Sequence, residues 1–138
     1  MHQDVEEFFK AYERAISESD ASAIGAYYAD AFMFGGPQGV QTVKKGDFLK
    51  VLPRRQEYFA SLGLLDTKVT SIEERSLDWK YLLVRTAWSM SFERATGVKE
   101  EIETLATFIL ERKASTLSIV FQIDHQDLAA RVKEPGWA

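Results

Sequence analysis

Residues 81–92 read YLLVRTAWSMSF, and this stretch decides the fold class. Every second residue from Leu82 to Phe92 is apolar except Thr86, whereas the residues between them are mostly small or polar. Successive side chains of a β-strand point to opposite faces, so a period of two is typical of a strand with one buried face. The stretch therefore predicts a long strand with one strongly apolar side.

Further strands are predicted on both sides of this stretch. A strand before it is joined through a turn near Leu77 and Asp78, and a turn near Gly97 follows it. Two shorter strands are expected earlier in the chain, connected through Gly35, Gly36 and Pro37. The predicted strands besides the central one cover residues 31–34, 40–43, 68–75, 102–112 and 116–124.

The first part of the chain has helical spacing. Asp4 and Glu7 are typical of a helix start, and apolar residues then recur every three or four positions as far as Ile16. Asp20 is expected to cap a second, short helix that carries Ile24, Tyr27 and Tyr28. A third helical stretch covers residues 48–62, and we expect Pro53 to break it into two segments.

Helices that precede a meander of strands predict an α+β fold, with the N-terminal helices packed on one face of a strongly curved, mostly antiparallel sheet. A length of 138 residues predicts a single domain over residues 1–138. The last two strands are partly apolar on both faces, since Leu105 and Ile109 alternate with Phe108, and Val120 alternates with Ile119 and Phe121. We therefore expect a second subunit to cover the face that the helices leave open, giving a homodimer.

Composition excludes several classes of function. A net charge of −4 argues against nucleic acid as a partner, and the absence of cysteine excludes thiolate-bound metals. His2 and His125 lie far apart, so no catalytic metal site is predicted, and no motif suggests a cofactor. No apolar run approaches the roughly 20 residues that span a bilayer, and no leader is apparent, so a cytoplasmic protein without membrane contact is expected.

Three stretches resemble one known superfamily. Residues 9–20 followed by Ala23-Ile24 and Tyr28-Ala29-Asp30-Ala31 are similar to the two-helix opening of NTF2-like (SnoaL-like) proteins. Residues 84–88, VRTAW, resemble a strand of that superfamily that ends in Trp, and residues 117–124 lie in the place of its last strand. The resemblance covers nearly the whole chain and implies a cone-shaped fold around one pocket.

Ketosteroid isomerase is a member of this superfamily, and its pocket holds a Tyr from the first helix and an Asp base after the first strand. Tyr12 resembles that Tyr in position. Where the resemblance would place the Asp before a proline, this chain has Gly35-Gly36-Pro37. Without a carboxylate there the proton transfer has no base, so isomerase activity is not inferred.

The candidate site residues have two interpretations. Aromatic and amide side chains could line a ligand pocket or simply pack in the core, and Gln122 could equally lie at a subunit interface. Tyr12, Asp30 and His125 are the candidates for acid–base work. The predicted pocket residues are Tyr12, Tyr28, Phe34, Phe59, Trp88 and Gln122.

Three hypotheses follow. The first is a pocket protein that binds a small, largely apolar molecule. The second is an isomerase, dehydratase or polyketide-cyclase type of enzyme, with Tyr12 as hydrogen-bond donor and Asp30 or His125 as base. The third is a non-catalytic dimeric interaction module, which predicts an interior filled by its own side chains.

Overall fold

The computed structural model describes residues 3–95 and 97–126, and the elements in this part follow the predicted order of helices and strands. The helices are α1 (Gln3–Ser17), α2 (Ala21–Gly25) and α3 (Lys45–Ser61). The strands are β1 (Tyr28–Gly36), β2 (Gly39–Lys44), β3 (Leu64–Ser76), β4 (Tyr81–Glu93), β5 (Lys99–Lys113) and β6 (Thr116–Asp124).

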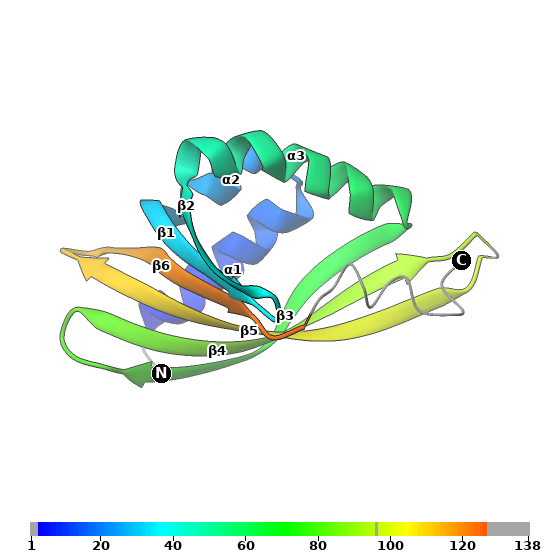
Figure 1. Cartoon of the computed structure of the whole chain (residues 1–138). Helices are drawn as coiled ribbons and strands as arrows, with labels where there is room; N and C mark the ends of the chain where they lie inside the picture. Colours follow the sequence, from blue (N-terminus) through cyan, green and yellow to red (C-terminus); the bar gives the residue numbers. More distant parts are fainter. Residues whose placement is uncertain (1–2, 96, 127–138) are drawn as a thin grey trace.

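All the strands of this part of the chain form one sheet, in the order β2-β1-β6-β5-β4-β3. The neighbours pair antiparallel except for β1 and β6, which run parallel. Figure 1 shows that the sheet is bent and that the helices lie together on its hollow side. The prediction of an α+β fold with a curved, mostly antiparallel sheet is confirmed. Within residues 3–95 and 97–126, no helix is both long and apolar enough to cross a membrane.

The core lies between the hollow face of the sheet and α1. Every second residue of β4 from Leu82 to Phe92 is buried, as the alternation predicts. Phe9 of α1 is fully buried, and its ring centroid lies 5.1 Å from that of Phe108 on β5. Burying a side chain of this size stabilises a fold by roughly 1.5–3 kcal/mol, so this contact holds α1 firmly on the sheet.

Helix α3 continues through Pro53, and the predicted break was wrong. Proline has no backbone N–H, so the carbonyl of Leu49 loses its partner within the helix. The side chain of Pro53 is exposed. On the solvent side of a helix the freed carbonyl can tilt outward and bond water, which explains why the helix tolerates the residue.

The segment after Asp20 differs from the prediction in the place where the helix ends. Asp20 caps α2, as expected, by accepting a hydrogen bond from the backbone N–H of Ala23 at 3.1 Å. The helix ends at Gly25, however, and Tyr28 is the first residue of β1. This difference matters because it places Tyr28 on the sheet, with its ring facing α1 across the core.

The last strand contains a β-bulge. Along β5 the partners of Ile109 and Leu110 are Phe121 and Ile119, so Val120 has no partner of its own. The extra residue shifts the alternation by one, which places Phe121 on the opposite face from Ile119. The prediction that Ile119 and Phe121 share a face was therefore wrong. Each residue from 121 to 124 points to the face opposite to the one that it would have in a regular strand.

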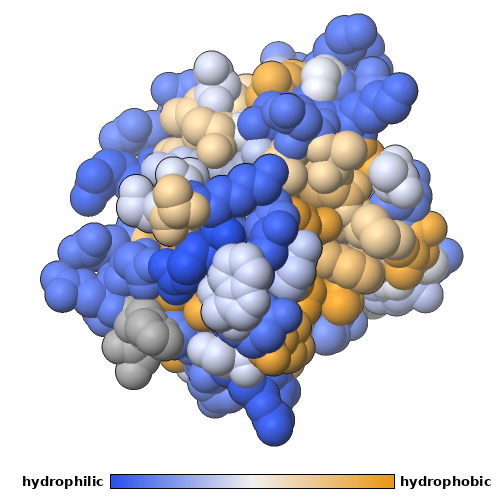
Figure 2. Space-filling view, turned by 90° about the vertical axis from the view of Figure 1, so that its left-hand side faces the viewer, coloured by the Kyte–Doolittle hydropathy of each residue, from blue (hydrophilic) through white to orange (hydrophobic). Residues whose placement is uncertain are grey.

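The outer face of the sheet exposes apolar side chains. Met33 and Val40 are 40% and 57% exposed, and the pairing places Phe121 and Ile123 beside the same part of β1. Figure 2 looks onto a different part of the surface, the left-hand end of the molecule in Figure 1, where hydrophobic side chains are also exposed beside hydrophilic ones.

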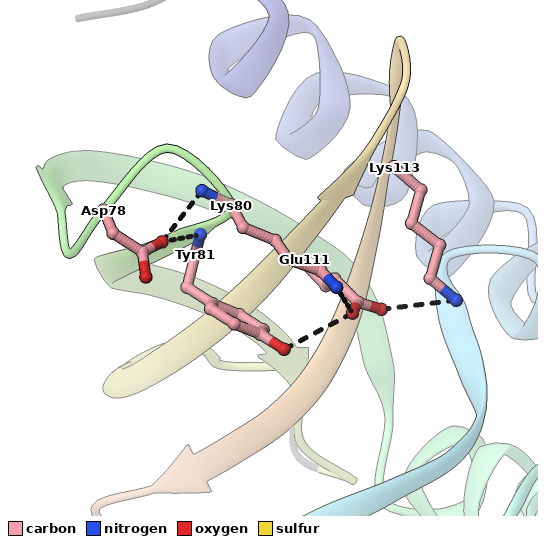
Figure 3. A network of polar contacts seen from close by, with 5 residues as sticks. All are labelled: Asp78, Lys80, Tyr81, Glu111 and Lys113. Carbon is pink, nitrogen blue, oxygen red and sulfur yellow. Dashed lines mark hydrogen bonds and ion pairs between the residues drawn. The ribbon is translucent and has the colours of Figure 1, made fainter.

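A polar network fixes the end of the sheet around the β3–β4 connection (Figure 3). Asp78 accepts hydrogen bonds from the backbone N–H groups of Lys80 and Tyr81, both at 2.8 Å. Glu111 on β5 lies 3.4 Å from Lys80 Nζ and 3.5 Å from Lys113 Nζ. Burial acts to raise the pKa of Glu111, but the hydrogen bonds and charges of the two lysines lower it below its ordinary value.

Gly63 connects α3 to β3 in a conformation that only glycine adopts easily. Its φ is +92°, and a Cβ atom there would lie 1.9 Å from the carbonyl oxygen of Glu93. The same two residues are joined by a hydrogen bond of 2.8 Å from Glu93 N–H to Gly63 C=O. The end of α3 is thereby fixed to the end of β4 by direct backbone contact.

Candidate functional site

A cavity of about 910 Å³ lies between the helices and the hollow face of the sheet. The structure brings together in its wall all six residues that the sequence suggested as pocket residues. They are Tyr12, Tyr28, Phe34, Phe59, Trp88 and Gln122. The interaction-module hypothesis predicted an interior filled by its own side chains, and an open space of this size does not fit it.

Most of the wall is apolar and aromatic. Trp88 is 6% exposed, and its ring centroid lies 5.9 Å from that of Tyr12. The indole N–H of Trp88 donates to the hydroxyl of Thr86 at 2.7 Å, so it is already occupied. Trp88 therefore offers a ligand an apolar ring surface rather than a free donor.

One chain of hydrogen bonds crosses the floor of the cavity. The hydroxyl oxygens of Tyr12 and Tyr28 lie 2.5 Å apart. Tyr28 also donates a short hydrogen bond to Oε1 of Gln122, and Nε2 of Gln122 donates to Oδ1 of Asp124 at 3.0 Å. The four side chains come from α1, β1 and β6, so three separate elements have to pack correctly to form the chain.

Asp124 is the functional candidate that the sequence interpretation missed. It lines the same cavity as Tyr12 and Tyr28. Burial raises the pKa of its carboxyl group, and the hydrogen bond from Gln122 and the positive charge of Arg55 offset only part of that effect. A carboxyl group with a raised pKa beside hydrogen-bonding hydroxyls is the usual setting of acid–base chemistry in proteins.

Both tyrosines remain protonated at ordinary pH. Burial raises the pKa of Tyr12 well above its usual range, although the hydrogen bond with Tyr28 acts in the opposite sense. Burial also raises the pKa of Tyr28, and the neighbouring hydroxyl of Tyr12 adds to the effect. The two groups can therefore donate and accept hydrogen bonds but cannot supply a charge.

The β-bulge at Val120 explains why Asp124 lines the cavity. Phe108 and Ala106 face the core from β5, and they pair with Gln122 and Asp124 on β6. In a regular strand Gln122 and Asp124 would share a face with Val120. The sequence held one usable signal, since a Gln122 that faces inward places Asp124, two residues later, on the same side.

Asp30 lies outside the cavity. Its side chain is fully exposed, and its Oδ1 lies 3.7 Å from Nζ of Lys45. His125 is exposed too, and its Nε2 lies 2.6 Å from the hydroxyl of Thr107, a residue that does not line the cavity. The hypothesis that used Asp30 or His125 as base required one of them beside Tyr12, and the structure brings neither there.

Helix α3 adds polar groups to the roof of the cavity. Arg55 lies with its guanidinium carbon 4.8 Å from the ring centroid of Phe59, and its charge acts on Tyr12 and Asp124. The next residue, Gln56, also lines the cavity, and its Nε2 is buried without a hydrogen-bond partner. A buried donor without a partner costs free energy, so a bound acceptor would stabilise this part of the protein.

Metal ligands do not gather in residues 3–95 and 97–126. No group of three or more His, Cys, Asp or Glu side chains in this part of the chain is placed to hold an ion. The polar groups of the cavity wall are hydroxyls, amides, carboxyls and basic side chains. Such a set can hydrogen-bond a ligand and exchange protons with it.

Solved structures of NTF2-like proteins share this fold. An NTF2-like protein from Shewanella oneidensis is 18% identical, with 89% of this chain and 97% of that chain covered and a TM-score of 0.72. A ketosteroid isomerase-like protein from Erwinia carotovora atroseptica is 21% identical over 87% and 91%, with a TM-score of 0.63. The β subunit of benzoate 1,2-dioxygenase from Burkholderia mallei is 14% identical over 94% and 93%, with a TM-score of 0.69.

These likenesses concern the fold, because proteins with the same fold perform many different functions. No curated protein matches the chain in sequence. A family described as NTF2-like protein (DUF6841) matches residues 3–127, which is most of the chain. The chain therefore belongs to the NTF2-like protein family DUF6841.

Proposed function

We propose that the protein binds a small, largely apolar molecule in the cavity between the helices and the sheet. The observation that carries this proposal is a cavity of about 910 Å³ that the core leaves open. Pockets for small molecules have this range of volume, with apolar walls and a few polar groups that orient the ligand. Trp88 and Phe59 supply apolar surface here, and the unpartnered amide of Gln56 supplies a donor.

Two matched variants test this proposal. Val43 on β2 lines the cavity and is half-buried, whereas Val98, just before β5, is 50% exposed and does not line it. We expect V43F to shrink the cavity and to weaken binding of an apolar probe by at least about tenfold, or 1.4 kcal/mol. V98F adds the same ring outside the cavity and should leave the affinity unchanged.

The probe is 2-isopropenylnaphthalene, and the signal is the fluorescence of Trp88 in a W79F/W137F background. Trp79 is 83% exposed, so its removal leaves the cavity untouched. Equal affinities of V43F and V98F, or no saturable binding by the unmodified protein, would count against the proposal. Thermal unfolding with and without probe gives a second measurement, since a ligand of the folded state raises its stability.

Acid–base catalysis of the isomerase, dehydratase or cyclase type is a second candidate function. The observation that favours it is a carboxyl group, Asp124, in the same cavity as the hydroxyls of Tyr12 and Tyr28. In this proposal the ionised carboxylate of Asp124 takes a proton from the carbon next to a ligand carbonyl, and Nε2 of Gln56 is the donor for the carbonyl oxygen. The test is exchange of the methyl hydrogens of 2-acetylnaphthalene in D₂O, followed by NMR.

We expect the unmodified protein to accelerate this exchange and D124N to abolish the acceleration. D66N is the matched control, because Asp66 also lines the cavity and takes no part in the hydrogen-bonded chain. A rate no faster than that in buffer, or an unchanged rate in D124N, would rule out catalysis by Asp124.

We also propose that two copies of the chain pair through the outer face of the sheet. This is supported by the apolar side chains on that face, because exposed apolar surface favours burial against a second apolar face. These side chains are the exposed Met33 and Val40 and the neighbouring Phe121 and Ile123. Sedimentation equilibrium should show a dimer that M33E converts to a monomer. L77E places the same charge at a leucine in the β3–β4 connection that is 53% exposed, and this variant should remain dimeric.

A further inference from the structure

The protonation of Asp124 fixes the direction of the hydrogen bonds along the cavity floor. An ionised carboxylate only accepts hydrogen bonds, so Gln122 must present Nε2 to Asp124 and Oε1 to Tyr28. The single hydroxyl proton of Tyr28 then goes to Gln122. The oxygen of Tyr28 accepts the proton of Tyr12, 2.5 Å away. Tyr12 therefore has no proton left for a ligand and offers only lone pairs.

A proton on Asp124 allows the opposite direction. The protonated carboxyl group donates to Gln122, whose amide can exchange its oxygen and nitrogen by a half turn without moving the other heavy atoms. Nε2 of Gln122 then donates to the oxygen of Tyr28. Tyr28 in turn donates to Tyr12, and the hydroxyl proton of Tyr12 becomes free to bond a group in the cavity.

We propose that Asp124, acting through Gln122 and Tyr28, switches the Tyr12 end of the cavity between hydrogen-bond acceptor and hydrogen-bond donor. A neutral ligand whose carbonyl oxygen lies against Tyr12 can only accept there, so it binds together with one proton. A ligand that donates a hydrogen bond, such as a phenol or alcohol, binds without taking up a proton. The inference deepens the proposed function, because it concerns the polar group of the molecule that occupies the same cavity.

Charged groups on several elements surround Asp124 or face the same cavity. Arg55 on α3 and His125 after β6 act directly on its carboxyl group and favour its ionised form. Burial favours the protonated form and outweighs these charges, so the pKa of Asp124 is raised. The other charged residues of the cavity wall are Lys44 at the end of β2, Asp47 on α3 and Asp66 on β3.

The switch can be observed without any ligand. With ¹³Cζ-labelled tyrosine, the NMR signals of Tyr12 and Tyr28 should shift together as Asp124 titrates, because their hydroxyls exchange donor and acceptor roles. Tyr58, which is 37% exposed, serves as the internal control and should not follow. In Q122M, whose side chain has nearly the same shape without the amide, Asp124 still titrates but the signal of Tyr12 should stay constant. A Tyr12 signal that is flat across the titration in the unmodified protein would overturn the inference.

Two probes of equal shape test the effect on binding. 2-Acetylnaphthalene carries a carbonyl, and 2-isopropenylnaphthalene replaces its oxygen by a CH₂ group. Above the pKa of Asp124, the Kd of the ketone should rise by up to about tenfold for each pH unit, as uptake of one proton requires. The Kd of the hydrocarbon should not change. D124N and Q122M should abolish the pH dependence for the ketone, whereas D66N should retain it.

These outcomes separate the inference from the proposed function. If both probes bind and neither affinity depends on pH, the cavity binds ligands but the switch is absent. If neither probe binds, the proposed function fails, and the tyrosine signals alone decide whether Asp124 controls Tyr12. A ketone affinity that depends on pH equally in Q122M and in the unmodified protein would assign the effect to the charge of Asp124 itself and overturn the switch.

Discussion

The hydroxyl oxygens of Tyr12 and Tyr28 lie 2.5 Å apart inside an apolar core, although one ring comes from α1 and the other from β1. Neither hydroxyl reaches water easily, since the two residues are only 4% and 3% exposed. Tyr12 therefore depends on Tyr28 for its hydrogen bond, whereas Tyr28 also bonds to Gln122. The contact joins the first helix to the first strand and brings the hydroxyls of both residues to one point beside the cavity.

The first prediction concerns the middle of the hydrogen-bonded chain. Y28F leaves both the hydroxyl of Tyr12 and Oε1 of Gln122 without their partners, so we expect a loss of about 1–3 kcal/mol in the free energy of unfolding. Y12F should cost less, because Tyr28 can still donate to Gln122. Urea unfolding measures both. Y58F, at an exposed ring, should change little, and a Y28F protein as stable as Y58F would contradict the prediction.

A second prediction concerns Gly63. G63A forces a side chain into a positive φ and against the carbonyl oxygen of Glu93, so we expect a loss of at least about 2 kcal/mol. Gly46 near the start of α3 has open space around it, and G46A should raise stability by up to about 1 kcal/mol. Chemical denaturation of the two variants checks the contrast. Equal stabilities would show that the α3–β3 connection relaxes easily.

Replacement of Pro53 gives a third prediction. P53A restores the missing N–H in α3 and removes the ring from its contact with the preceding turn, so the free energy of unfolding should rise by about 1–3 kcal/mol. K50A, at an exposed position of the same helix, should change it by no more than about 0.5 kcal/mol. If P53A were less stable than the unmodified protein, the loss of unfolded-chain entropy that proline causes would stabilise the protein by more than proline destabilises the helix.

The dependence of stability on pH gives a fourth prediction. The pKa of Asp124 is raised in the folded protein, so between its ordinary and its raised value the folded chain holds a proton that the unfolded chain has released. Stability therefore falls as pH rises through this window and levels off above it. D124N should lack the decrease. The measurement is urea unfolding of both proteins across a pH series.

Glu111 provides the opposite case for comparison. Its pKa is lowered in the folded protein, so its contribution is present above the ordinary value for Glu and is lost as pH falls through the lowered one. E111Q should therefore differ from the unmodified protein mainly at neutral pH. Relative to the unmodified protein, D124N and E111Q should alter the dependence of stability on pH in opposite directions. If both altered it in the same direction, the pKa shift assigned to Asp124 or to Glu111 would be incorrect.

Much of the fold could be predicted because its signals are local. The alternation from Leu82 to Phe92 and the helical spacing up to Tyr12 each reflect burial of one face of the element. Burial of one face is enough to give the sequence a regular period of apolar residues. Asp20 was predictable as a helix cap because this signal is local too. The continuation of α3 through Pro53 was not predictable, because it depends on whether the carbonyl of Leu49, which proline leaves without a hydrogen bond, can bond water instead.

The site could be predicted only in part. Its aromatic residues follow from the same alternation that gives the core, so Trp88 and Phe34 were found as pocket candidates. Asp124 was not, because its direction depends on the bulge at Val120, which is a shift in the register of β6 against its neighbour β5. The alternation of residues along β6 does not show where such a shift occurs.

The unpaired residue of β6 also makes the chemistry of the cavity depend on how the strand is paired. If β6 ran beside β5 without the bulge, Val120 would lie opposite Ile109, and Phe121 and Ile123 would point into the cavity in place of Gln122 and Asp124. Loss of Val120 itself would leave Gln122 and Asp124 inside, because the residues on either side of it already alternate. The same amino acids can therefore give a polar or an apolar cavity floor according to the pairing register alone.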